Sequence, residues 1–290
     1  MTHLIPMIDL HIHTNASDGE LSPKELIDKA ISKGIKIIAI TDHDSVSGIQ
    51  EALDYSKNKE IEVVPGVEIS CDEEEVGFFD VHILGLFIDH KNKELNDLLT
   101  KLKQERIIQK KEIIKKINDL GYDITFEELK KETGDSFGRP HIAKILMRKY
   151  PNFSTVNQVF DELIGKGKKA YVDQKKCHVK EAIKVIKKAE GVAILAHPAV
   201  FRLKDVPELI DLFLESGGDG LEVYYPYDKI CNIDKKDSKK RIELIKKIAE
   251  EKNLLVSGGS DYHGPIRPTN LAEIEIPNSV IERLREGWKK

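Results

Sequence analysis

Two hydrophobic periods alternate along the first third of the chain. Short apolar runs rich in isoleucine and valine are typical of buried strands and predict strands at 7–10, 35–40, 61–67 and 81–86. Between them, helical spacing of apolar residues predicts helices at 21–33 and 46–57. Ser22, Pro23 and Gly34 suit the cap, the first turn and the end of the first helix. This alternation predicts parallel βα units.

The pattern changes between residues 98 and 172, where only helical periodicity is present. Helices are predicted at 98–120, 125–132, 140–149 and 155–164. The alternation then resumes, with helices at 179–188, 206–215 and 236–252 and strands at 192–196, 220–223 and 254–257. We therefore expect an α/β protein, a βα barrel in two parts (1–97 and 173–290), interrupted by an all-helical insertion (98–172).

Composition narrows the class of protein. A formal net charge of −4 and a pI of about 6.2 argue against a protein that grips long nucleic acid by bulk charge. The sequence has no apolar run of 18 residues and its start does not resemble a signal peptide, so we expect a cytoplasmic protein without a membrane anchor. The distant cysteines Cys71, Cys177 and Cys231 form no CxxC pair and are expected to be reduced and structural.

Histidines and carboxylates gather where the predicted strands end. In chain order these residues are His11, His13 and Asp18, then Asp42 and His43, then Glu68, His82 and His197, and finally Asp261 and His263. Residues two apart in a strand point to one face, so His11 and His13 can bind the same ion. The carboxyl ends of the strands form the active-site rim of a βα barrel, and we expect these side chains to meet there.

The number of such residues favours a metal site. A single histidine such as His82 or His197 is more often an ordinary hydrogen-bonded residue. Six of the ten histidines together with three carboxylates, all placed at strand ends, instead indicate a metal centre. Asp9 and Asp42 fit either of two roles, as turn residues or as carboxylates that orient a ligating imidazole. Three histidines are expected at the surface: His3, His90 and His178.

Several motifs occur in a recognisable order. DLHIHTNASDG, TDHD, GVE, VHILG, AHP and GGSDYHG resemble the PHP (polymerase and histidinol phosphatase) phosphoesterase superfamily over essentially the whole chain. Within the insertion, GRPHIAKIL and GKGKKAYV are similar to the TrpH-like branch, which includes nucleotide 3′,5′-bisphosphate phosphatases and 5′-3′ oligoribonucleotide exonucleases. One position departs from that branch, because Asp228 stands where it often has a histidine.

The resemblance implies a distorted seven-stranded (β/α)7 barrel and three divalent metal ions, commonly manganese. It also implies three ligand sets, in which Glu68 bridges the first two metals: His11, His13 and Asp261; His82 and His197; and Asp18, His43 and His263.

Charge and ligand chemistry point the same way as the resemblance. Three divalent ions would exceed the charge of three carboxylates by about +3, which suits a phosphate. Mixed imidazole and carboxylate ligation favours manganese, with zinc or iron as alternatives, over magnesium. We expect a metal-dependent phosphoric ester hydrolase that uses a hydroxide bridging two metals and no protein nucleophile. Either His141 or a metal-bound water could protonate the leaving oxygen.

Three residues of the insertion are expected to bind the substrate, a small phosphorylated molecule such as a nucleotide or short RNA. Arg139, His141 and Lys168 lie in the segments that resemble the nucleotide branch, although such cations are often plain surface charges. Two rival functions remain at this point: a histidinol-phosphate or other small-molecule phosphatase, and a non-catalytic module stabilised by metal. No obligate protein partner is predicted.

Overall fold

The computed structural model describes residues 7–133, 138–265 and 267–289, so His3 lies outside the described residues. By its internal contacts the chain divides into two compact units. One comprises Met1–Leu99 with Cys177–Lys290 and is called the barrel unit here, and the other comprises Thr100–Lys176 and is called the helical unit.

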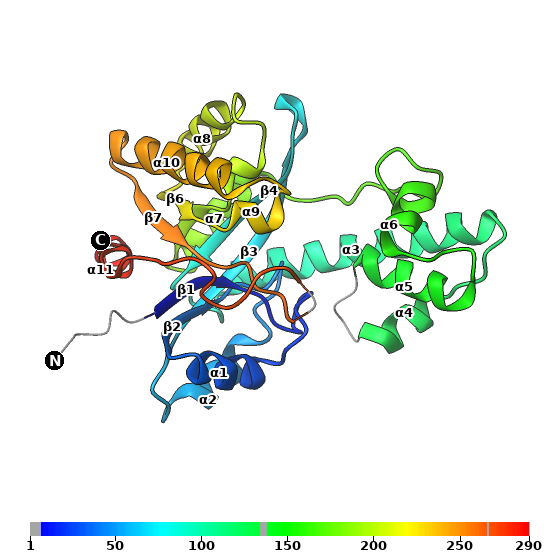
Figure 1. The fold of residues 1–290 in the computed structure, drawn as a ribbon, viewed down its shortest axis with the longest axis horizontal. Coiled ribbons are helices and arrows are strands. Elements are labelled where there is room, and N and C mark those ends of the chain that lie inside the picture. Colours follow the sequence, from blue (N-terminus) through cyan, green and yellow to red (C-terminus); the bar gives the residue numbers. More distant parts are fainter. Residues whose placement is uncertain (1–6, 134–137, 266, 290) are drawn as a thin grey trace. The chain divides into compact units, whose positions relative to one another are not determined.

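Seven strands of the barrel unit form one sheet, and neighbours in the sheet follow the order of the chain (Figure 1). The strands are β1 (Met7–Ile12), β2 (Ile35–Ile40), β3 (Glu62–Glu73), β4 (Phe78–Leu86), β5 (Val192–Leu195), β6 (Gly220–Tyr224) and β7 (Leu255–Gly258). β1 also meets the segment after β7, because Ile12 pairs with Tyr262 and the His13 amide donates to the Tyr262 carbonyl at 2.9 Å. The sheet therefore closes into the distorted barrel that the sequence predicts.

β4 runs antiparallel to both neighbours, whereas the sequence suggested a continuing parallel series. A 3-10 turn over Glu74–Val76 and the left-handed Gly77 (φ 79°) join it to β3. So short a link permits only a hairpin, because a parallel crossover needs a dozen or more residues. His82 pairs with Ser70, so the first half of β4 lies beside the last half of β3. His82 therefore reaches the rim from within a strand and not from its end.

Seven helices in the described part of the barrel unit pack against this sheet. They are α1 (Pro23–Ser32), α2 (Ile49–Ser56), α7 (Val179–Lys188), α8 (Val206–Glu215), α9 (Tyr227–Ile230), α10 (Lys235–Glu251) and α11 (Asn278–Trp288). The predicted helices 179–188 and 206–215 match α7 and α8 residue for residue. α1 begins at the predicted cap, where Ser22 and Glu25 each accept a hydrogen bond from the other's amide. The helices α9 and α11 were not predicted from the sequence pattern.

Buried apolar residues fill the barrel itself. One cluster takes a side chain from each of five neighbouring strands: Leu10, Ala39, Val64, Leu84 and Ile194. The barrel interior is therefore a packed core, and polar chemistry is confined to its rim. The thiols of Cys71 and Cys177 are also buried, with their sulfur atoms 3.7 Å apart.

The helical unit has its own apolar core. α3 (Lys93–Asp119) begins in the barrel unit and continues into the helical unit, which also contains α4 (Phe126–Thr133), α5 (Arg139–Lys149), α6 (Val156–Val159) and a π-helical turn (Phe160–Ile164). Fully buried members of its core include Ile113, Ile117, Ile142, Leu146 and Val159. Among the described residues, no helix combines the length and apolar character needed to cross a bilayer.

Candidate metal centre

The side chains proposed as metal ligands meet at one rim of the barrel unit. They come from six strands or from the loops directly after them: His11 (β1), His13 and Asp18 (after β1), His43 (after β2), Glu68 (β3), His82 (β4), His197 (after β5), and Asp261 and His263 (after β7). Of the seven strands, β6 contributes none of the nine.

Glu68 lies at the middle of this cluster and is 1% exposed. Five imidazole nitrogens lie 2.9–3.3 Å from its two oxygens, those of His11, His13, His43, His82 and His197. Oε2 faces the first three rings and Oε1 faces the last two. A single carboxylate is therefore shared by two sets of imidazoles, as expected for a ligand that bridges two ions.

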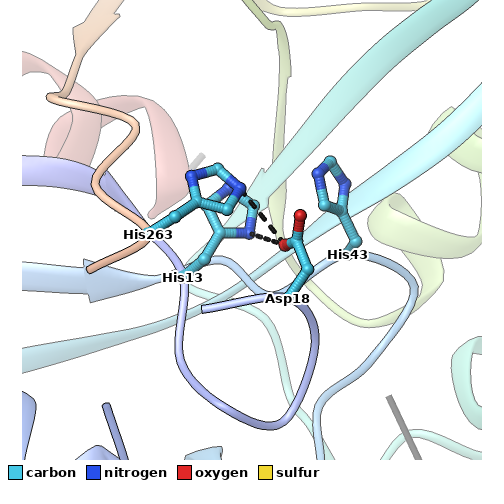
Figure 2. Close-up of side chains that lie close together, drawn as sticks. All are labelled: His13, Asp18, His43 and His263. Carbon is cyan, nitrogen blue, oxygen red and sulfur yellow. Dashed lines mark ion pairs between the residues drawn. The ribbon is translucent and has the colours of Figure 1, made fainter. Parts of the chain in front are cut away.

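Two further carboxylates flank Glu68. Asp261 Oδ1 lies 3.1 Å from His13 Nε2 and 3.5 Å from His11 Nε2. On the other side, Asp18 Oδ1 lies 3.1 Å from His263 Nε2 and 3.8 Å from His13 Nδ1 (Figure 2). The atoms of three groups each lie within 4.8 Å of one another: His13, Asp18, His43 and His263; His11, His13 and Glu68; and His43, Glu68 and His82.

The chemistry of these atoms fits metal ions. Seven buried atoms of the cluster have no hydrogen-bond partner of acceptable geometry among the described residues: His11 Nε2, His13 Nε2, Asp18 Oδ1, His43 Nδ1, Glu68 Oε2, His82 Nδ1 and His197 Nδ1. Buried polar atoms are normally satisfied, so such a concentration of unsatisfied lone pairs calls for cations. His197 (φ 31°) and Asp261 (φ 52°) also hold a left-handed backbone, a strain that concentrates at functional sites.

The charges in the cluster balance one another. Burial alone would raise the pKa of Glu68, but the imidazoles of His43 and His11 hold it well below its usual range. Burial likewise opposes charge on His13 and His82, yet nearby carboxylates raise the pKa of each ring to about 10. Burial prevails at His43 and lowers its pKa to about 3. Protons on some rings thus offset the carboxylates, a role that bound cations would take over.

Asp9 and Asp42 are buried and hold the loops that carry the cluster. Asp9 accepts hydrogen bonds from the Ser260 amide (2.8 Å) and hydroxyl (2.6 Å), next to Asp261. Asp42 accepts from the Thr14 amide at 2.7 Å and from the Ser17 hydroxyl at 2.6 Å. Both carboxylates thus order the backbone beside a proposed ligand.

Two buried polar residues, one within β6 and one directly after it, were not predicted from the sequence. Glu222 is 0% exposed and lies 3.0 Å from His11 Nδ1, and the Tyr225 hydroxyl donates to Asp261 Oδ2 at 2.8 Å. A signal for Glu222 was available, because a lone glutamate between Leu221 and Val223 in an apolar strand is rarely buried without a partner.

Arg139 begins α5 in the helical unit. Its guanidinium lies over the rings of Phe160 and Tyr171, 5.6 and 5.7 Å from their centres. Lys110 of α3 is only 3% exposed, and burial, with the charges of Arg106 and Arg139, lowers its pKa well below the usual range. Three cationic side chains therefore influence one another within this unit.

The other two proposed substrate residues also lie in the helical unit. His141 Nδ1 accepts a hydrogen bond from the Gly138 amide at 3.0 Å, which leaves the proton of a neutral ring on Nε2. Lys168 is exposed in the turn that follows the π-helical segment. In the barrel unit, Asp228 accepts a hydrogen bond from the Ser238 hydroxyl at 3.2 Å.

Comparison with known proteins identifies the family. Residues 9–195 match the PHP domain. A 5′-3′ exoribonuclease of Haemophilus influenzae is 34% identical, with 94% of this chain and 96% of the relative covered. A 3′,5′-nucleoside bisphosphate phosphatase of Chromobacterium violaceum is 29% identical, with coverage of 89% and 87%.

A solved structure from Bifidobacterium adolescentis, assigned as a metal-dependent phosphoesterase, superposes with a TM-score of 0.81 at 27% identity. The match covers 97% of this chain and 96% of that one, which includes the helical unit as well as the barrel. The chain therefore belongs to the PHP domain family and is a metal-dependent phosphoester hydrolase.

Proposed function

We propose that this enzyme removes phosphate from nucleotide 3′,5′-bisphosphates and also acts at the 5′ ends of short oligoribonucleotides. The observation that carries the proposal is the rim of imidazoles around Glu68, with a second group formed around Asp18. The exoribonuclease and bisphosphate phosphatase relatives, similar over nearly their whole length, support the class of substrate.

The proposed centre holds three divalent ions, with Mn²⁺ favoured and Zn²⁺ or Fe²⁺ as alternatives because nitrogen and oxygen ligands are mixed. The ligand sets are His11, His13 and Asp261 with Glu68; Glu68 with His82 and His197; and Asp18, His43 and His263. When bound, such ions polarise phosphoryl oxygens and make coordinated water more acidic.

The protein itself contributes the negative charges that surround the proposed metal ions. Asp18, Glu68 and Asp261 are the three carboxylates among the proposed ligands, so three divalent ions leave a surplus of about +3 at the rim. A phosphate dianion would offset most of that surplus, and a neutral substrate would not. The rim thus selects for phosphate before any contact with the rest of the substrate is made.

We further propose that the helical unit binds a second phosphate through Arg139, with His141 and Lys168 contributing. Burial lowers the pKa of Lys110 well below its usual range, so a bound anion that favours the charged ammonium would offset part of the cost of burial. A guanidinium can bind phosphate through two parallel hydrogen bonds, and the rings of Phe160 and Tyr171 hold Arg139 in place. His141 is one candidate for the proton donor to the leaving oxygen, and a metal-bound water is the other.

A panel of substrates and metals tests the proposal. Protein stripped of metal is reloaded with Mn²⁺, Zn²⁺, Fe²⁺ or Mg²⁺ and assayed on adenosine 3′,5′-bisphosphate, a 5′-phosphorylated oligoribonucleotide and histidinol phosphate. We expect metal-dependent turnover that is fastest on the first two substrates. Preference for histidinol phosphate would replace the nucleotide assignment, and metal binding without turnover of any phosphate ester would replace enzymatic function with a structural role.

A further inference from the structure

β6 supplies no proposed metal ligand, yet its Glu222 touches two of them. The Glu222 side chain is 0% exposed and lies behind the cluster. Oε1 is 3.0 Å from His11 Nδ1, and Oε2 accepts a hydrogen bond from the His197 amide at 2.8 Å. Both oxygens of a fully buried carboxylate are therefore committed to residues that the proposed centre uses.

The contact with His11 decides which ring nitrogen carries a proton. A carboxylate can only accept hydrogen bonds, so Nδ1 of His11 must be the donor. In the neutral ring the lone pair is then left on Nε2, which lies 3.3 Å from Glu68 Oε2 and 3.5 Å from Asp261 Oδ1. That nitrogen is one of the buried atoms with no partner of acceptable geometry. Glu222 thus aims the free lone pair of His11 into the cluster.

The contact with His197 fixes a strained backbone. His197 has a left-handed conformation (φ 31°, ψ 50°), which is unfavourable for a residue with a side chain. The Glu222 oxygen satisfies its buried amide, and the ring places Nε2 3.1 Å from Glu68 Oε1. One carboxylate therefore supports a ligand on each side of Glu68.

We propose that Glu222 is a positioning residue that raises the affinity of the rim for metal ions by imposing the Nδ1-protonated form of His11 and holding the backbone of His197. This inference rests on the proposed metal centre. Carboxylates in this place behind a ligating histidine typically change metal affinity by roughly 10- to 100-fold when altered.

The isosteric change Glu222→Gln tests the tautomer argument directly. The backbone amide of His197 can only donate, so it keeps the amide oxygen of the new glutamine and turns the NH₂ group toward His11. Nδ1 must then accept, and the proton moves to Nε2, where it blocks the metal. We expect the Kd for Mn²⁺, measured by calorimetry on metal-free protein, to rise roughly 10- to 100-fold.

A matched control is available at the other end of the same strand. Asp219, directly before β6, accepts from the Ala193 amide at 2.8 Å much as Glu222 accepts from His197, but it lies outside the cluster. Asp219→Asn should lower the melting temperature and leave the affinity for Mn²⁺ unchanged. Glu222→Gln should have the opposite effects. Without metal, its melting temperature should be close to that of the wild-type protein, and Mn²⁺ should raise this temperature less than it does for the wild type.

A second measurement is independent of activity and affinity. In Zn²⁺-loaded, ¹⁵N-labelled protein, wild-type His11 should show a protonated Nδ1 and a metal-bound Nε2, and Glu222→Gln should show a protonated Nε2. Wild-type affinity and an unchanged His11 signal in the variant would overturn the proposal, as would equal metal loss in Asp219→Asn. Failure of the wild-type protein to bind Mn²⁺ would instead overturn the metal centre itself.

If Glu222→Gln does not fold, Glu222→Asp takes its place. The shorter carboxylate keeps the charge and the Nδ1 donor but cannot span both His11 and His197. We expect Glu222→Asp to lose less Mn²⁺ affinity than the loss expected for Glu222→Gln. The melting temperature of the metal-free protein should stay that of the wild type. An affinity equal to wild type would contradict the positioning role.

Discussion

Glu68 shows how much one residue can organise in this protein. Its two oxygens face five imidazoles, so the charge of a single buried side chain affects every ring around it. A change at one of these five histidines should therefore also affect ions to which that histidine is not bound, because all five rings face the same carboxylate.

His43 is the ligand at which this coupling is most easily tested. It belongs to the Asp18 group, yet its Nδ1 is 3.1 Å from Glu68 Oε2. We expect His43→Asn to lower metal content and activity together, which elemental analysis and phosphate release would measure. His90→Asn is the matched control, since His90 bonds Gln50 away from the rim. Full metal content with a wild-type rate in His43→Asn would contradict its assignment as a ligand.

Arg139 should matter only for substrates that carry a second phosphate. A charge-assisted hydrogen bond contributes roughly 1.5–3 kcal/mol, so Arg139→Met should lower kcat/KM on a 3′,5′-bisphosphate by roughly ten- to a hundredfold. An aryl phosphate should lose much less, because it never makes the contact. Arg148→Met, at the exposed other end of α5, serves as the control. Equal losses on both substrates would indicate damage to the fold or the rim.

Lys110 should destabilise the folded protein at neutral pH. Its folded pKa lies well below the unfolded value of 10.5, so the unfolded chain binds the extra proton and the free energy of unfolding rises with pH between the two values. We expect Lys110→Met to melt at a higher temperature than wild type at pH 7, with the difference shrinking toward pH 10.5.

Millimolar inorganic phosphate extends the Lys110 test. If the cations of the helical unit bind phosphate, added inorganic phosphate should raise the melting temperature of the wild-type protein more than that of Lys110→Met. A variant less stable than wild type at pH 7 would show that the lysine is retained for packing and not for an anion.

At the scale of elements, capping sets the stability of α1. Ser22 and Glu25 form a reciprocal capping box at its start, with 2.8 Å between the Ser22 amide and the Glu25 carboxylate. Ser22→Ala should lower the free energy of unfolding by about 1 kcal/mol, measured by urea titration. Metal content and kcat should not change, because Ser22 lies outside the cluster. A larger loss that includes metal would mean that the cap also holds the loop of Asp18.

Local patterns were enough to predict most of the elements. α7 and α8 have clear apolar faces and matched their predicted bounds, and β2 was predicted from Ile35 to Ile40 as observed. The direction of β4 was not predictable in the same way. The acidic residues Glu68 and Asp72 interrupt the apolar run of β3, so the strand was ended too early and the short link to β4 was hidden.

Most of the proposed ligands could be suggested from the sequence because they follow predicted strand ends, where a parallel sheet collects its polar residues, although Glu68 and His82 lie within the observed strands β3 and β4. Glu222 could not be found by that rule, because it lies within β6 and acts on residues 211 and 25 positions away. Periodicity describes which face of an element is apolar, but it does not say which distant side chain a buried polar residue meets.

At the scale of the whole molecule, the two units differ sharply in charge. The helical unit has 18 lysine and arginine residues against 11 aspartate and glutamate residues, so it is cationic within a chain whose net charge is −4. The total charge argued against a nucleic-acid-binding protein, but it averages over two unlike parts. The helical unit alone has the sign of charge that a phosphate backbone attracts.

Salt should therefore discriminate between substrates. Raising the salt concentration from 50 to about 200 mM should lower kcat/KM for a 5′-phosphorylated oligoribonucleotide much more than for an aryl phosphate, because each phosphate contact releases counterions. For oligonucleotides of increasing length, the slope of log(kcat/KM) against the logarithm of the salt concentration is measured. The aryl phosphate controls for effects of salt at the rim. Identical slopes for both substrates would show that the cationic unit does not bind the chain of the substrate.

Closure of the barrel between β1 and the segment after β7 has a consequence for synthesis on the ribosome. Ile12 is made early and pairs with Tyr262, and His11 and His263 both lie 3.5 Å from Asp261 Oδ1. One edge of the first strand stays unpaired until almost the whole polypeptide has been synthesised. Contacts between residues so far apart in sequence also form slowly. A nascent or truncated chain accordingly lacks the complete set of proposed ligands, so we expect premature products to have no assembled metal centre.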